Sequence, residues 1–394
     1  MANTYQDLLQ KTRAEIKNID LNDADRLRRE GAVLIDIREA DEVEQGIVDG
    51  AVHIPRGFLE SRIEQVATDK SAPVVVYCAG GARSVFGTKA LEDLGYTDVA
   101  SMDGGFNAWK TAALPWSKPA SFSQDQRRRY SRHFLLPEVG EAGQQTLLNT
   151  KVLMIGAGGL GSPAALYLAA AGIGTLGIID DDIVDDSNLQ RQVAHTTDRI
   201  GMPKVESAKA AIEALNPDVK VITYQTRLDK ENILGIFEDY DIILDGTDNF
   251  ATRYLINDAC VLLGKPNVHG SIFRFEGQAT VFNPPDGPCY RCIFPDPPPP
   301  DLAPNCAEGG VLGVLPGTVG LIQSTEVLKL ALGIGTTLSG RLLMYDALEE
   351  EFRELILDRD PNCPICGEHG HKSLDDIEYT EVGCFVPALA GAAA

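Results

Sequence analysis

Residues 152–161 read Val-Leu-Met-Ile-Gly-Ala-Gly-Gly-Leu-Gly, a short apolar run followed directly by a glycine-rich turn. Further apolar runs lie at 176–179 and 242–245, and the segments between them have the apolar spacing typical of helices. Strands that alternate with helices imply a parallel, doubly wound sheet. We therefore predict a mainly parallel α/β domain over residues 127–370.

A smaller α/β domain is predicted upstream, over residues 1–115. Its apolar runs lie at 32–35 and 74–77, with helix-like stretches between them. The stretch 116–126 is rich in small polar residues and follows a proline, so we interpret it as a linker. Residues 371–394 are acidic and then small and apolar, and we expect a tail there. A length of 394 residues agrees with two domains.

The composition excludes several classes of protein. A formal net charge of −22 repels phosphate backbones and anionic lipid, so we expect no direct nucleic-acid binding and no membrane contact. The polar residues 1–20 lack the apolar core of a signal peptide. Polar positions such as Glu326 interrupt the apolar stretch 310–335, which favours a buried helix. Eight cysteines without an export signal indicate metal binding or catalysis in a cytoplasmic protein.

The glycine-rich turn is predicted to bind a phosphate group. Gly156, Gly158, Gly159 and Gly161 let the backbone turn tightly, so that a helix N-terminus can meet the phosphate. Asp180 closes the next apolar run, at the spacing where Rossmann-like domains bind ribose hydroxyls. This pattern alone is typical of NAD sites, so an NAD-dependent oxidoreductase is one interpretation.

The residues that follow favour ATP. Ser187, Asn188 and Arg191, within the run SNLQRQ, and then Lys204 place amides and cations downstream of the acidic residue. A reaction that splits ATP needs such groups because the leaving pyrophosphate carries charge, whereas a nicotinamide site does not. The alternative for Arg191 and Lys204 is a solvated helical face.

Asp248 and Asn249 follow the apolar run that ends at Asp245. Parallel sheets place ligand-binding loops at this position. The Asp248 carboxylate could hold Mg2+ beside the phosphates. The alternative for Asp248 is the N-cap of a helix.

Two CxxC pairs, about seventy residues apart, predict a metal site. Cys289 and Cys292 form one pair, and Cys363 and Cys366 form the other. Four thiolates complete a tetrahedral Zn2+ site and leave no position for water, so the metal is structural. The alternative is two unrelated thiol pairs.

Cys78 ends an apolar run and is followed by Ala-Gly-Gly-Ala and Arg83. Small residues let the loop wrap so that backbone N–H groups point inward, which favours a thiolate and then a persulfide. We predict a reactive thiol at Cys78, with Arg83 closing its loop. An inert cysteine is the alternative.

The motifs GAGGLG, IIDDDIVDDSNLQRQ, GMPKVESA, LDGTDN and CYRC…CPIC resemble those of the ubiquitin-activating-type adenylyltransferases. Within this family the chain resembles molybdopterin-synthase adenylyltransferase and its thiamine-pathway relative, over about residues 126–367. The resemblance implies a homodimer, since Arg132 matches an arginine lent to the partner subunit. It also implies that Cys306 can attack the activated acyl group, with a purely structural cysteine as the alternative. The implied ATP contacts are Gly158, Asp180, Asn188, Arg191, Lys204 and Asp248.

Residues 18–115 resemble the rhodanese domain, by the Cys78 loop and by the segments 36–38, 50–55 and 104–109. Related cysteine phosphatases have five residues in the loop, whereas four separate Cys78 from Arg83. This shorter loop implies sulfur chemistry. Many two-domain relatives carry the rhodanese domain last, whereas here it comes first.

Together the resemblances imply an enzyme that uses MgATP to adenylate the C-terminal Gly-Gly of a ubiquitin-like sulfur-carrier protein. Persulfide sulfur, supplied by thiosulfate or a cysteine desulfurase, would then form a thiocarboxylate. Molybdopterin synthesis is the first interpretation, and thiamine synthesis or tRNA thiolation are alternatives. A non-catalytic scaffold is an alternative of a different class.

Overall fold

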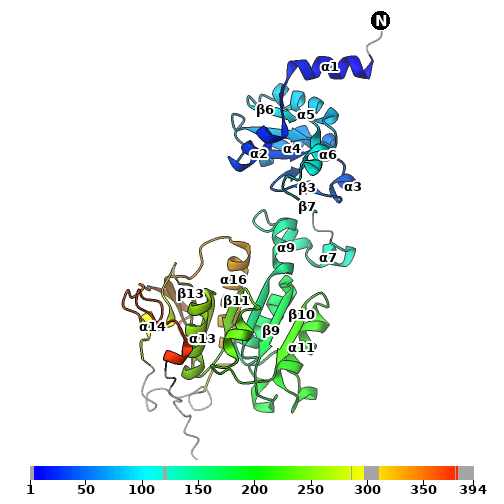
Figure 1. The fold of residues 1–394 in the computed structure, drawn as a ribbon. Helices are drawn as coiled ribbons and strands as arrows, with labels where there is room; N and C mark the ends of the chain where they lie inside the picture. Colours follow the sequence, from blue (N-terminus) through cyan, green and yellow to red (C-terminus); the bar gives the residue numbers. More distant parts are fainter. Residues whose placement is uncertain (1–3, 119–121, 285, 297–309, 378, 380–394) are drawn as a thin grey trace, which may run out of the picture. The chain divides into compact units, whose positions relative to one another are not determined.

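The computed structural model describes residues 4–118, 122–284, 286–296, 310–377 and 379 (Figure 1). The chain divides into two compact units, Met1–Gln124 and Asp125–Ala394. Both are α/β units with helices on both faces of a sheet, as the sequence predicts.

The first unit is built on a five-stranded parallel sheet in the order β1-β6-β5-β2-β4. Strand β5 is buried at every position, as expected where helices cover both faces. The strands of this sheet are β1 (Lys17–Ile19), β2 (Val33–Asp36), β4 (Val52–His53), β5 (Val74–Tyr77) and β6 (Val99–Met102).

Helices cover both faces of this sheet. Leu59 of α4 and Leu91 of α5 belong to one apolar cluster, and Ala24 of α2 and Trp109 of α6 belong to another. Helix α1 packs against α5 (Figure 1). The helices are α1 (Tyr5–Glu15), α2 (Leu21–Arg29), α3 (Ala40–Val43), η1 (Arg56–Phe58), α4 (Leu59–Val66), α5 (Ala82–Asp93) and α6 (Gly105–Thr111).

The expected linker begins inside the first unit. Strand β7 (Trp116–Ser117) pairs antiparallel with β3 (Ile47–Val48). The Trp116 ring meets the Phe106 ring edge-on at 5.9 Å between centroids. The β3 pairing and the ring contact of the half-buried Trp116 explain why the first two residues of the expected linker are part of the folded unit.

The second unit contains an eight-stranded sheet in the order β10-β9-β8-β11-β12-β13-β14-β15. Parallel ladders join β10 through β12, and antiparallel ladders join β12 through β15. The predicted parallel core is therefore present, with an antiparallel extension that the sequence did not predict. The strands are β8 (Lys151–Ile155), β9 (Thr175–Ile179), β10 (Lys220–Tyr224), β11 (Ile242–Asp245), β12 (Asn267–Phe273), β13 (Glu276–Phe282), β14 (Arg341–Asp346) and β15 (Glu351–Ile356).

Apolar residues of α10, α11 and α16 form the core on one face of this sheet, and those of α12 and α13 form the core on the other. The helices are α7 (Gln124–Arg129), α8 (Ser131–Phe134), α9 (Gly140–Asn149), α10 (Gly161–Ala171), η2 (Asp186–Asn188), η3 (Thr197–Arg199), α11 (Lys204–Leu215), α12 (Ile233–Phe237), α13 (Phe250–Leu263), α14 (Tyr290–Ile293), α16 (Leu315–Leu332) and η5 (Leu374–Asp376).

Helix α16 is the buried helix expected within 310–335. Gln323 is fully buried, and its amide donates to the backbone oxygens of Asp245 and Val268 at 2.7 and 3.0 Å. Gly270 on β12 makes room for this amide, because a Cβ at Gly270 would lie 2.4 Å from it. Across the described ranges, no helix has the length and apolarity that a bilayer crossing requires.

The expected tail also begins inside a folded unit. Leu374 and Ile377 are buried in the core of the second unit, and the Tyr379 hydroxyl donates to Asp258 at 2.7 Å. These apolar side chains follow a CxxC pair closely, which explains why the chain stays packed beyond residue 371.

Candidate functional site

A pocket opens at the carboxyl ends of β8, β9 and β11. The connections leave the sheet in opposite directions on either side of β8, and ligands of doubly wound folds bind at such a switch point. The pocket brings together eight residues predicted from the sequence: Gly156, Gly158, Gly159, Asp180, Arg191, Lys204, Asp248 and Asn249.

The glycine-rich turn forms one wall of the pocket. Gly156 has a φ of +92°, which favours glycine. A Cβ at Gly161 would lie 1.9 Å from the Gly156 oxygen, so Gly161 lets the start of α10 approach the turn. A Cβ at Gly158 would meet only the Gln192 amide, at 3.6 Å. Gly158 therefore keeps the pocket open, whereas Gly161 keeps the turn closed.

Asp180 fixes the turn from the end of β9. Its carboxylate accepts from the Ala157 and Asp182 N–H groups at 2.8 and 2.9 Å. Burial raises the pKa of Asp180, and the nearby Lys204 ammonium opposes that rise. Asp180 thus supports the glycine turn and lines the pocket at once.

Lys204 is buried, with 6% of its surface exposed, and donates to Asp182 at 2.7 Å. The solvated-face alternative is therefore wrong for Lys204, because the start of α11 points its ammonium into the pocket. Arg191 is half-buried and also lines the pocket, with one guanidinium N–H donating to the Ser187 oxygen at 3.1 Å.

Asn249, and not Asp248, caps helix α13. Its side chain accepts from the Thr252 N–H at 2.9 Å. Asp248 is exposed and forms no side-chain hydrogen bond or ion pair within the part of the chain that the structure describes. The N-cap alternative for Asp248 is wrong, because the side chain of Asn249 caps the helix. A free carboxylate at the pocket fits a Mg2+ ion that is bound mainly by phosphate oxygens.

The four CxxC cysteines come together in the second unit. The Sγ–Sγ distances are 3.8 Å for Cys289–Cys292, 3.5 Å for Cys289–Cys363 and 3.3 Å for Cys292–Cys366. A tetrahedral zinc with Zn–S bonds of about 2.3 Å needs sulfurs about 3.8 Å apart. The cluster therefore fits a structural Zn2+.

Helix α13 holds the first CxxC pair. Asn257 accepts from the Tyr290 N–H at 2.7 Å, and Asp258 binds Arg291 through a pair of hydrogen bonds at 2.8 and 2.9 Å. Since α13 starts beside Asp248, one helix joins the cysteine cluster to the pocket.

Cys78 lies at the end of β5 in the first unit and is 1% exposed. The Gly81 N–H donates to its Sγ at 3.2 Å, and the Phe106 N–H donates to its backbone oxygen at 2.8 Å. Gly105 permits this approach, because a Cβ there would lie 2.2 Å from the Cys78 oxygen. The loop thus aims a backbone donor at the sulfur, as predicted.

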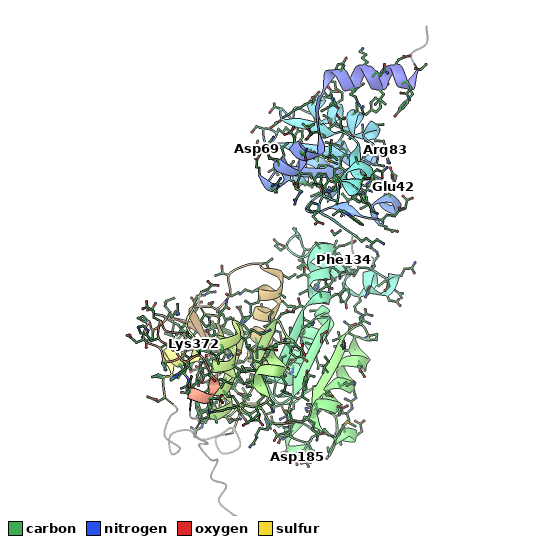
Figure 2. All side chains as sticks on the ribbon, in the orientation of Figure 1. Glu42, Asp69, Arg83, Phe134, Asp185 and Lys372 are labelled. Carbon is green, nitrogen blue, oxygen red and sulfur yellow. The ribbon has the colours of Figure 1, made fainter. Side chains whose placement is uncertain are left out.

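Arg83 does not stand free at the end of this loop. Its guanidinium donates twice to Glu42, each time at 2.6 Å, and Figure 2 shows the two side chains together. The bond from Arg83 lowers the pKa of Glu42 to about 2, so the carboxylate stays ionised. A second arginine, Arg38, forms a buried pair with Asp36 at 2.6 Å.

A family model for the ThiF family matches residues 130–365, more than half of the chain. The chain belongs to the ThiF family. A rhodanese-like domain model matches residues 20–112. The predicted kind of enzyme, an adenylyltransferase with a sulfurtransferase domain, is therefore confirmed for this ThiF-family chain.

Curated relatives agree with this assignment. The SAMP-activating enzyme E1 of Haloferax volcanii is 53% identical over 261 residues, 66% of this chain and 96% of its own. The "Probable adenylyltransferase/sulfurtransferase MoeZ" of Mycobacterium tuberculosis is 54% identical over 259 residues, 64% of this chain and 66% of its own. The crystal structure of E. coli MccB with ATP shares the fold, with a TM-score of 0.54 and 22% identity over 63% of this chain and 75% of its own.

Four of the residues predicted for the nucleotide site of this ThiF-family chain lie outside the pocket lining, and Cys306 lies outside the described residues. Gly161 supports the turn, and Ser187 donates to Asp185 at 2.5 Å. Asn188 is half-buried in η2, and Arg132 is exposed on α8. Their contacts with a nucleotide stay predictions.

Three residues of the site were not predicted. Arg253 and Gln192 are buried and line the pocket, and each has one side-chain polar atom without a partner among the described residues. His195 holds the glycine turn, since its ring bonds the Ala157 oxygen and the Ser207 hydroxyl, both at 2.9 Å. The signal for Arg253 was its place one turn into the helix that follows Asp248.

Proposed function

We propose that this enzyme uses MgATP to adenylate the C-terminal Gly-Gly of a ubiquitin-like sulfur-carrier protein and then supplies persulfide sulfur to it. One observation carries the proposal: a single pocket combines a glycine turn, the cations Lys204 and Arg191, and the unpaired carboxylate of Asp248. Residues 127–370 would adenylate the carrier and residues 1–115 would deliver the sulfur.

The pocket suits each part of ATP. Ile155, Ile179 and Leu228 provide apolar surface for the adenine ring, and Asp180 lies where ribose hydroxyls bind. Lys204 and Arg191 would stabilise charge on the phosphates. When bound at Asp248, Mg2+ would neutralise further phosphate charge.

Adenylation needs no nucleophile from the enzyme. The carrier carboxylate attacks the α-phosphorus of ATP, the α–β phosphoanhydride bond breaks, and pyrophosphate leaves with the electron pair. Positioning and charge stabilisation suffice for such a reaction. Gly-Gly suits the carrier end because its thin backbone can thread a narrow channel. Arg132, from the partner subunit of a homodimer, would add one more cation.

Sulfur transfer would begin at Cys78. Its thiolate takes the outer sulfur of thiosulfate and releases sulfite, or takes the outer sulfur of a cysteine desulfurase persulfide and releases that thiolate. The Cys78 persulfide then attacks the acyl-AMP and displaces AMP, either directly or after relay through Cys306. Reduction of the resulting acyl disulfide by a thiol yields the thiocarboxylate.

The carrier defines the pathway. We propose molybdopterin synthesis because of the motif resemblance, with thiamine synthesis or tRNA thiolation as alternatives. The Haloferax relative is named a SAMP-activating enzyme, so activation of a SAMP-type carrier is a further alternative for this chain. Four thiolates that hold Zn2+ need a reducing compartment, which supports a cytoplasmic location.

ATP–pyrophosphate exchange tests the proposal. We expect exchange only when a carrier ending in Gly-Gly is present, and loss of about 100-fold or more in Asp248→Asn. Cys78→Ser should leave exchange intact and abolish thiocarboxylate formation. Exchange that survives in Asp248→Asn would refute the site. Tight NADH binding without ATP binding would favour the oxidoreductase alternative.

A further inference from the structure

Helix α1 precedes the residues that match the rhodanese-like domain, yet it packs beside the Cys78 loop. The match begins at residue 20, whereas α1 spans Tyr5–Glu15 and packs against α5. A capping box between Thr4 and Asp7 starts the helix, and the Tyr5 and Phe86 rings meet at 6.1 Å between centroids. The sequence therefore adds a defined helix to the side of the sulfur-transfer unit.

Arg13 connects this helix to the loop. Its Nη2 donates to the Gly81 oxygen at 3.0 Å, and its own backbone oxygen accepts from Asn18 at 2.8 Å. Gly81 has a φ of +87°, and its N–H is the group that donates to the Cys78 sulfur. Arg13 thus holds the residue that faces the sulfur.

The other cations near this loop are already paired with acids. Arg83 of α5 binds Glu42 of α3, and Arg38, after β2, binds Asp36. Arg13 binds a neutral carbonyl and forms no ion pair with the described residues. Asp103, in the turn before α6, is exposed. Arg13 is exposed, and its guanidinium reaches the loop through this hydrogen bond to the Gly81 carbonyl.

We propose that Arg13 is a positioning residue for sulfur transfer at Cys78. By holding the Gly81 carbonyl, Arg13 restrains the backbone of Gly81, whose N–H on the preceding peptide donates to the Cys78 sulfur. This inference rests on the proposed role of Cys78 as the residue that takes the outer sulfur of the donor and carries it as a persulfide.

The test compares Arg13→Ala with Lys11→Ala in the full chain, because Lys11 is an exposed cation on the same helix. Peptide-resolved iodoacetamide alkylation of Cys78 is followed from pH 5 to 10, and kcat/KM for thiosulfate is measured with cyanide as acceptor. We expect Arg13→Ala to shift the alkylation midpoint to higher pH and to lower kcat/KM about three- to tenfold. Lys11→Ala should change neither, and Arg13→Lys should restore part of both.

An unchanged midpoint and rate in Arg13→Ala would overturn the inference. A lowered melting temperature with an unchanged midpoint would also overturn it, because it would reduce Arg13 to a support of the fold. Persulfide formation that survives in Cys78→Ser would instead refute the proposed function. ATP–pyrophosphate exchange, which does not involve the loop, should be normal in every Arg13 variant.

Discussion

The two units each place a glycine-rich loop between a parallel strand and a helix, but the loops differ in how their polar groups are used. The loop after β5 closes around one atom, the Cys78 sulfur, and Arg83 beside it is paired with Glu42. The loop after β8 borders an open pocket with the unpaired carboxylate of Asp248. In the proposed function, one topology would serve a small covalent cargo in one unit and a large charged ligand in the other.

The difference shows what each loop needs from its surroundings. A single sulfur atom can be held by a nearby backbone donor, and in the first loop the Gly81 N–H provides that hydrogen bond to Cys78. A triphosphate would expose many charged oxygens, and the second loop lies beside the cations Lys204 and Arg191 and the unpaired carboxylate of Asp248. Substitutions that affect only one of the two units test this comparison.

Loss of the metal should have the largest effect and should be confined to the second unit. Cys363→Ser removes one of four thiolates, and we expect a loss of stability of about 3 kcal/mol or more, since metal binding contributes directly to folding. Hydrogen exchange should accelerate in α13 and stay unchanged in β5. Cys260→Ala, which removes a buried thiol of α13 outside the cluster, is the matched control. Equal losses in the two variants would contradict a zinc site.

Two alanine substitutions separate the turn of the second loop from its pocket. Gly161→Ala places a Cβ 1.9 Å from the Gly156 oxygen, so we expect a stability loss of about 1–3 kcal/mol in denaturant unfolding. Gly158→Ala meets no close atom and should change stability by about 0.5 kcal/mol or less. Gly158→Ala should nevertheless weaken ATP binding, measured by calorimetry, because its methyl group narrows the pocket. A large stability loss in Gly158→Ala, with weaker ATP binding only in Gly161→Ala, would contradict these assignments.

Mild acid should loosen the second loop before the first. Burial lowers the pKa of His195, so the folded state holds this ring neutral. Its stabilising contribution is complete above the unfolded pKa of about 6.5 and is lost as the pH falls towards the folded pKa. We expect the unfolding free energy of the second unit to fall between pH 6.5 and 5, and His195→Gln to reduce that slope. A slope that His195→Gln leaves unchanged would assign the effect to other groups.

Release of Arg83 should give the smallest effect. Glu42→Gln keeps the hydrogen bond from the Glu39 N–H, so α3 should remain capped. The guanidinium then loses its acidic partner, and we expect the KM for thiosulfate to fall about two- to fivefold, the range of an exposed ion pair. Asp41→Asn is the matched control, since it removes a charge from the same helix. An unchanged KM would show that Glu42 does not restrain Arg83.

The features predicted from the sequence are those encoded by short segments. Gly156–Gly161 and the two CxxC pairs have fixed local spacing, so their turn and their metal geometry follow from a few residues. The strand at 242–245 located Asp248 because parallel strands present ligands at their carboxyl ends. The N-cap, which was the alternative considered for Asp248, lies one residue later at Asn249, since Asp and Asn are equally good caps.

The features that were not predicted depend on contacts between distant positions. Glu42 and Arg83 are 41 positions apart, and Arg13 and Gly81 are 68 apart. No periodicity marks such pairs before the fold is known. Trp116 and Leu374 were placed in a linker and a tail by composition, whereas apolar contacts bring both into folded units.

The buried amide of Gln323 lies where Gly270 has no side chain. A larger residue at position 270 would collide with the amide, and an apolar residue at 323 would leave two backbone oxygens without their donor. Neither position can vary alone without cost, so the two should change together across evolution. Substitutions at position 323 on α16 and position 270 on β12, more than fifty positions apart, should therefore be correlated among related sequences.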